Sequence, residues 1–158
     1  GKLADQSFLD RSGEDPSHGF AKALLEACGE TGPVFAYNAG FEKSRIQELA
    51  TRFPRLAVAL SALAERVVDL LPVARAHYYH PDQEGSWSIK AVLPSLCPDL
   101  DYTQLDGVQN GGMAMEAYAE GLAATTTPER KAEIERQLIA YCALDTLALV
   151  RLWSAFRG

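Results

Sequence analysis

The stretch Ala140-Tyr-Cys-Ala-Leu-Asp-Thr-Leu-Ala-Leu-Val-Arg-Leu-Trp153 decides how we interpret this chain. It is predicted to form the second half of a long helix, because apolar residues recur at helical spacing at Leu144, Leu147, Val150 and Leu152. Tyr141 and Asp145 stand four residues apart and therefore share one helix face. A phenol and an acid beside a buried apolar stripe indicate a chemical role for this helix face. The rest of the sequence must decide whether it has that role.

Segments upstream of this helix alternate between strand-like and helix-like patterns. Apolar runs bounded by turn residues predict strands at Leu3–Leu9, Val34–Tyr37 and Val67–Leu70. Start and stop signals predict helices at Pro16–Cys28, from Phe41 to about Arg52 and from Pro54 to about Arg66. Alternation of this kind is typical of an α/β domain with a mixed or parallel sheet.

The second half of the chain is predicted to contain helices and loops only. Leu71–Tyr79 is helical or irregular, and Ser86 or Ser88 can cap a helix that contains Ile89–Leu93. The Pro- and Asp-rich segment Cys97–Asn110 is predicted as a loop. Two further helices are expected, at Met113 to about Leu122 and from Thr125–Glu129 to Phe156, the latter with or without a kink near Tyr141.

The composition is typical of one globular domain: 158 residues, 47% of them hydrophobic and 23% charged, with a net charge of −6. This acidic balance argues against binding nucleic acid through bulk charge. It is compatible with a nuclease whose carboxylates bind metal ions. Three cysteines without a C-x-x-C pair make a zinc site or a disulfide framework unexpected. We therefore expect a cytoplasmic protein without a membrane-spanning segment.

The start of the chain resembles the far side of a hairpin, because Gly1 and Lys2 are followed at once by the strand-like Leu3–Leu9. We therefore expect residues 1–158 to be a single partial domain from the C-terminal part of a longer chain. Its missing first strands would leave an open sheet edge through which the chain could associate with itself.

Three acids are predicted to lie near one another in such a domain. Glu42 follows the strand Val34–Tyr37, Asp69 ends the next strand, and Asp145 lies on the last helix. Ligand sites of open α/β sheets lie at the carboxyl ends of strands. Hard cations such as Mg²⁺ prefer oxygen ligands, and two of them about 4 Å apart can activate water for phosphodiester hydrolysis.

Four segments in this order resemble the DnaQ-like 3′–5′ exonucleases of the RNase H-like superfamily, in the branch named for its acidic residues and a tyrosine (DEDDy). They are Asn38-x-x-Phe41-Glu42, Val68-Asp-Leu-Leu71, Ser88-Ile-Lys-Ala-Val92 and Tyr141-Cys-Ala-Leu-Asp145. The His-Tyr-Tyr-His-Pro, Gly-Ser-Trp-Ser-Ile-Lys and Tyr-Cys-x-x-Asp-Thr segments more narrowly resemble an uncharacterised bacterial family of unknown function within this group. The resemblance runs from about Leu3 to Phe156.

This resemblance implies an RNase H-like mixed sheet flanked by helices and a two-metal 3′–5′ exonuclease acting on DNA or RNA. Glu42 and Asp145 would bind Mg²⁺ or Mn²⁺, and Tyr141 would orient the attacking water. Asn38 and Lys90 would contact single-stranded or 3′-ended nucleic acid. The family's Asp-x-Glu motif is absent and Glu42 replaces the usual Asp, so we expect residues 1–158 alone to be inactive. The alternative is a non-catalytic nucleic-acid-binding or assembly module.

Each candidate residue also has a structural interpretation. Glu42 could interact with a helix dipole, and Asp69 could cap the following helix. Asp145 could pair with Arg151 or Lys131, and Tyr141 could be a core-edge aromatic residue. Asn38 could stabilise a turn, and Lys90 could be solvated. Two loop features stay open in the same way: a weak zinc pattern at His77, His80 and Asp82, and base stacking or loop packing by Tyr78, Tyr79 and Trp87.

Overall fold

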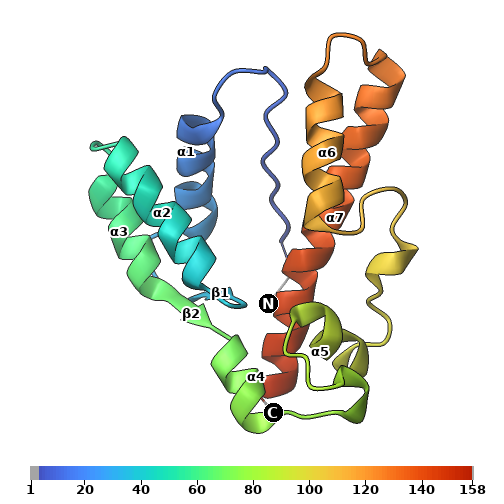
Figure 1. The fold of residues 1–158 in the computed structure, drawn as a ribbon. Helices are drawn as coiled ribbons and strands as arrows, with labels where there is room; N and C mark the ends of the chain where they lie inside the picture. The colour runs from blue at the N-terminus through green and yellow to red at the C-terminus, as the bar shows by residue number, and fades with distance from the viewer. Residues whose placement is uncertain (1–3, 158) are drawn as a thin grey trace.

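Helices dominate the fold. The computed structural model describes residues 4–157 (Figure 1), and Leu3 of the predicted first strand lies outside this range. The helices are α1 (Ser17–Cys28), α2 (Gly40–Arg52), α3 (Ala57–Arg66), α4 (Leu71–His77), α5 (Ile89–Leu96), α6 (Gly111–Leu122) and α7 (Pro128–Phe156). Two 3₁₀ turns, η1 (Pro81–Gln83) and η2 (Tyr102–Gln104), flank α5. The strands are β1 (Val34–Ala36) and β2 (Val67–Asp69).

The predicted RNase H-like mixed sheet is wrong. Within residues 4–157 the only sheet is the parallel pair β1–β2, with Val34 opposite Val67 and Ala36 opposite Asp69. The predicted strand at Leu3–Leu9 is not formed in its described part, because no other strand pairs with it. Instead Phe8 packs edge-on against Phe20 of α1, at 5.9 Å between ring centroids. A strand needs a hydrogen-bonded neighbour, and this segment contacts helices instead.

Local start signals explain why the helices form where the sequence predicts them. Pro128 occupies the first position of α7, and Thr127 Oγ1 accepts the backbone N–H of Arg130. Asn110 caps α6 by accepting the N–H of Met113. The predicted helices at residues 16–28, 41–52 and 54–66 are confirmed as α1, α2 and α3, which begins at Ala57. The last helix is one continuous 29-residue element without a break at Tyr141.

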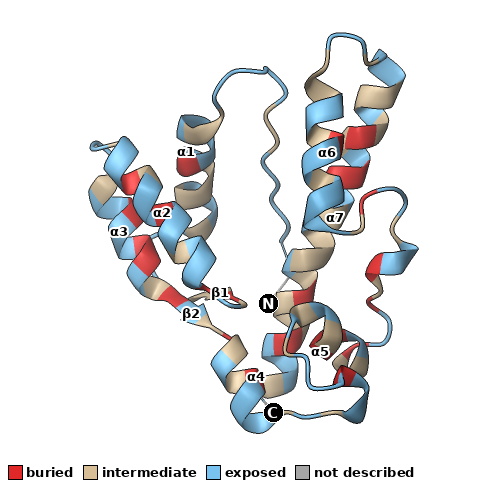
Figure 2. Cartoon of the chain, viewed as in Figure 1, coloured by how far each residue is buried: buried red, intermediate tan, exposed pale blue. Residues whose placement is uncertain are grey.

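Two arms meet at a common base in Figure 1. One arm contains α1, α2 and α3 around a core that includes Leu60 and Leu63. The other contains α6 and the first half of α7, around Ile134 and Leu138. The base joins α4, α5 and the second half of α7, and Figure 2 shows buried residues concentrated on the faces that pack together. The second half of α7 thus lies where both arms join.

A pocket of about 530 Å³ lies between the segment of residues 5–9, α1 and α7. Phe8, Phe20 and Leu138 are among its apolar lining residues. The β1 edge that does not face β2 has no strand partner within residues 4–157. Length and composition alone would also allow α7 to cross a membrane, but a core helix passes the same test, and α7 packs on α5 and α6.

Candidate active site

Asp145 is held by a tyrosine that is distant in sequence. The hydroxyl of Tyr102, in η2, donates a hydrogen bond of 2.6 Å to Asp145 Oδ1. Tyr141 lies one helical turn before Asp145, and its ring centroid is 6.1 Å from that of Tyr102. Asp145 is half-buried at this point, while Arg151 pairs with Asp99 instead of Asp145. The predicted pair Tyr141–Asp145 therefore shares one face with a third polar side chain.

Lys90 of α5 joins the same cluster. Its Nζ lies 5.2 Å from the centre of the Tyr102 ring, a cation–π distance, and donates to the backbone carbonyl of Gln109 at 3.2 Å. Gln109 in turn donates to the carbonyls of Thr103 and Leu105. The predicted loop Cys97–Asn110 is thereby fixed in place. We call Lys90, Tyr102, Tyr141 and Asp145 the Asp145 cluster.

The loop also needs a glycine to reach this position. Gly107 has φ of +75°, and a Cβ atom there would lie 2.3 Å from the side chain of Gln137 in α7. Gln137 is buried, so it has little room to move. The close approach of this loop to α7 allows the hydroxyl of Tyr102 to reach Asp145.

Both phenols in the cluster are kept protonated. Burial, followed by the hydrogen bond to Asp145, raises the pKa of Tyr102 well above the ordinary value for tyrosine. Burial, and then the negative charge of Asp145, also raises the pKa of Tyr141. Two neutral O–H groups therefore face one carboxylate, and they can donate hydrogen bonds to it or to a water beside it.

Replacing Tyr102 with phenylalanine should lower the free energy of unfolding by about 2 kcal/mol, since a hydrogen bond to a charged group is lost. Urea unfolding of the protein measures this value. Tyr79→Phe is the matched control, because that tyrosine is 67% exposed and its loss should change stability by less than about 0.5 kcal/mol. Equal stability of both variants would mean that the Tyr102–Asp145 bond contributes nothing to the fold.

Asp69 is engaged by backbone groups. Its Oδ1 accepts the N–H groups of Asn38 and Leu71, each at 2.9 Å, and its Oδ2 accepts that of Ala39 at 3.1 Å. The bond to Leu71 agrees with the interpretation that Asp69 caps the following helix. The bonds to Asn38 and Ala39 also tie Asp69 to the turn after β1. Asn38, at φ of +62°, has its backbone fixed by Asp69, while the residue itself is exposed. Asp69 is therefore a structural acid in this fold.

Glu42 lies in the first turn of α2, exposed and without an ion pair among residues 4–157. This position also agrees with an acid near a helix N-terminus. No hydrogen bond between described residues joins it to the Asp145 cluster, so shared metal binding by Glu42 and Asp145 stays a prediction. In the weak zinc pattern, His80 Nδ1 instead accepts the N–H of Asp82 and caps η1.

The donor set does not fit a complete two-ion centre. In the described part of the chain, no group of three or more His, Cys, Asp or Glu side chains could hold a metal ion. Asp69 uses both carboxylate oxygens for backbone N–H groups, and Asp145 uses one for Tyr102. Asp145 Oδ2 carries no hydrogen bond from the described residues, so it can offer one ligand oxygen.

The sequence prediction included Tyr141, Asp145 and Lys90, which the fold brings together, but missed Tyr102. Tyr102 is separated from Asp145 by 43 positions and lies in a segment predicted only as loop. The one available signal was apolar spacing within that loop, where Leu100 and Tyr102 alternate with acids at positions 99 and 101. Leu100 and Tyr102 are both buried.

A protein-family model described as "Domain of unknown function (DUF2779)" matches residues 1–88. The chain belongs to this family. The match agrees with the predicted resemblance to an uncharacterised family, and it includes Asn38, Glu42 and Asp69 but ends before Lys90 and the last helix. No curated protein and no solved structure matches the chain. The DUF2779 assignment carries no activity with it, so function must be argued from the site.

Proposed function

We propose that this DUF2779 chain contributes the catalytic face of a metal-dependent 3′–5′ exonuclease that hydrolyses phosphodiester bonds of DNA or RNA. One observation carries the proposal. Two sequence motifs with exonuclease-like residues, the one with Lys90 and the one with Tyr141 and Asp145, converge on the Asp145 cluster although they lie about fifty residues apart.

The residues of the cluster divide into three tasks. Asp145 supplies negative charge and an oxygen ligand, and Tyr141 supplies a neutral hydroxyl to orient the attacking water. Lys90 supplies a positive charge for a phosphate oxygen. We propose Glu42 as a second metal ligand and Asn38 as a further nucleic-acid contact. Mg²⁺ or Mn²⁺ is the expected cofactor, but it needs oxygen ligands beyond Glu42 and Asp145.

A second candidate function is a non-catalytic nucleic-acid-binding or assembly module. The lack of a three-ligand metal group within residues 4–157 favours it. So does the β1 edge without a strand partner in the same residues, which can support self-association. Our proposal includes a reducing, cytoplasmic location, which agrees with three free cysteines, Cys28, Cys97 and Cys142.

Digestion of end-labelled oligonucleotides by the intact protein separates the two functions, since residues 1–158 alone are expected to be inactive. With Mn²⁺ present, an exonuclease of this polarity should release the label of a 3′-labelled single strand as mononucleotide in the first cleavage. The same strand labelled at its 5′ end should give a ladder that shortens gradually. Chelation by EDTA should stop both reactions. Binding of the strand without shortening, over a range of Mn²⁺ and Mg²⁺ concentrations, would favour the non-catalytic module.

A further inference from the structure

A second groove lies between the end of β1, α4 and the start of α5. It has a volume of about 520 Å³ and is lined chiefly by Tyr37, Asn38, Arg75, Trp87 and Ser88. We call it the Arg75 groove. Its volume is within the range of small-ligand sites, and its lining combines a cation, aromatic rings and polar donors.

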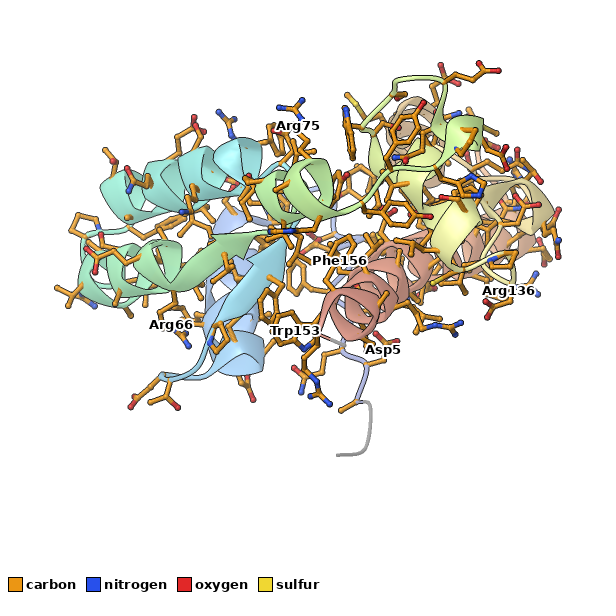
Figure 3. All side chains as sticks on the ribbon, turned by 90° about the horizontal axis from the view of Figure 1, so that it is seen from below. Asp5, Arg66, Arg75, Arg136, Trp153 and Phe156 are labelled. Carbon is orange, nitrogen blue, oxygen red and sulfur yellow. The ribbon has the colours of Figure 1, made fainter. Side chains whose placement is uncertain are left out.

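Arg75 is a cation available for an external anion. It is exposed and forms no ion pair or hydrogen bond with the residues described here. Figure 3 shows it at the surface, between the half that contains α1–α3 and the half that contains α5–α7. Arg66, by contrast, donates to the backbone carbonyls of Gly29 and Gly32 and is used by the fold. Arg75 can therefore contact a phosphate without breaking an internal bond.

Trp87 lines the same groove, and part of its side chain packs against the core cluster at the base of the fold. The hydroxyl of Tyr37 donates to the backbone carbonyl of Trp87 at 2.8 Å, which ties this loop to the end of β1. Trp87 is half-buried, so part of its side chain remains accessible. A base stacks well on a held aromatic ring, and every base has a face for such stacking.

Polar groups of the groove are also available. Asn38 is exposed, and no hydrogen bond to its side chain is formed by the residues of the described range. Ser88 precedes α5, but its hydroxyl does not cap the helix. Asp69 is the acid whose charge affects the Tyr37 hydroxyl, and it already accepts three backbone N–H groups. The groove therefore presents a cation together with polar groups that can donate or accept hydrogen bonds.

The groove and the Asp145 cluster use neighbouring residues at the start of α5. Ser88 lines the groove, and Lys90, two residues later, lies over the Tyr102 ring that bonds to Asp145. A cation and an aromatic ring in one groove are a pattern suited to single-stranded nucleic acid.

We propose that the Arg75 groove binds single-stranded nucleic acid, with one base stacked on Trp87 and an adjacent phosphate on Arg75. This assignment rests on the proposed exonuclease function for its substrate class. It adds a binding site of its own, which can be measured without hydrolysis. Sequence alone left Trp87 open between base stacking and loop packing. The structure packs part of its side chain against the core and leaves the rest accessible in the groove, where a base could stack.

Fluorescence anisotropy of a labelled oligothymidylate, measured in EDTA to exclude cleavage, tests the phosphate contact. Arg75→Gln should weaken binding several-fold and lower the slope of log K against log salt by about 0.7. Arg136→Gln is the matched control: it removes the same charge from another exposed arginine and should leave the slope nearly unchanged. Equal effects of the two substitutions would overturn the groove assignment.

Tryptophan emission tests the base contact, because the chain has only two tryptophans. Trp153 stacks on Phe35, so Trp153→Phe keeps an aromatic ring there and leaves Trp87 as the single reporter. Adding the oligothymidylate should quench Trp87 emission, and Trp87→Leu should weaken binding by roughly tenfold. Thermal unfolding of each variant checks that the fold is retained.

The outcomes separate this inference from the proposed function. Binding without quenching of Trp87, or equal binding of a blunt duplex, would overturn the groove assignment and leave the exonuclease proposal intact. Quenching and weaker binding by Arg75→Gln, without any strand shortening by the intact protein under Mn²⁺, would support the groove and reject the exonuclease. No binding by the unmodified protein would overturn the groove assignment, and digestion by the intact protein under Mn²⁺ would still decide the exonuclease proposal.

Discussion

In the intact protein, Asp145→Asn is expected to remove nuclease activity while preserving the fold. Asparagine matches aspartate in shape, and its Oδ1 can still accept the Tyr102 hydroxyl that now bonds to Asp145. It lacks the negative charge, and a neutral amide is a poorer ligand for a hard cation. Loss of such a charged group at a reacting centre should lower the rate by roughly a hundredfold or more. The rate at which label is released from a 3′-labelled oligonucleotide with Mn²⁺ present measures this loss of activity.

Tyr141→Phe is the companion variant, since it removes one hydroxyl and leaves Asp145 unchanged. Its loss of activity should be smaller, about tenfold, because only the orientation of water is affected. Urea unfolding should give nearly the same free energy for Asp145→Asn as for the unmodified protein. Undiminished digestion by Asp145→Asn would refute the catalytic role, and equal losses in both variants would show that the two roles are assigned wrongly.

Helices were predictable because their signals are local. A proline at the first position and a threonine cap mark the start of α7, and apolar spacing marks the face that it buries. The helix α4, predicted as helical or irregular, is formed at Leu71–His77. None of these elements needs information from a distant part of the chain.

The sheet was not predictable in the same way, because a strand depends on its neighbour. The apolar runs at Val34 and Val67 do pair with each other, and each forms only three residues of strand. The run at residues 4–9 has a similar pattern but places Phe8 against α1 and Leu9 against the α6–α7 core. Fold class inferred from alternating patterns was therefore wrong, although the individual helices were correct.

The candidate site was partly predictable for a related reason. Tyr141 and Asp145 are linked by helix geometry, so their proximity follows from spacing alone. Tyr102 reaches Asp145 only because the loop before α6 is fixed by Gln109, Lys90 and the close contact at Gly107. Such packing of a loop against a helix leaves almost no periodic signal in the sequence.

Asp69→Ala is expected to be the most damaging single substitution outside the apolar core. It would leave three backbone N–H groups, those of Asn38, Ala39 and Leu71, without the carboxylate that accepts them. Hydrogen bonds to a charged group each contribute about 1.5–3 kcal/mol, and water can replace part of this at the exposed Asn38. We expect the free energy of unfolding to fall by about 3 kcal/mol.

Urea unfolding of three variants resolves the cause of this loss. Asp69→Asn keeps one acceptor oxygen and should cost less, about 1–2 kcal/mol. Asp106→Ala removes an exposed acid whose carboxylate bonds to nothing in the described range, and should cost under about 0.5 kcal/mol. A small loss for Asp69→Ala, similar to that for Asp106→Ala, would contradict the structural role. Asp69 would then be available as a metal ligand in addition to Glu42, and our assignment of Asp69 as a structural acid would be wrong.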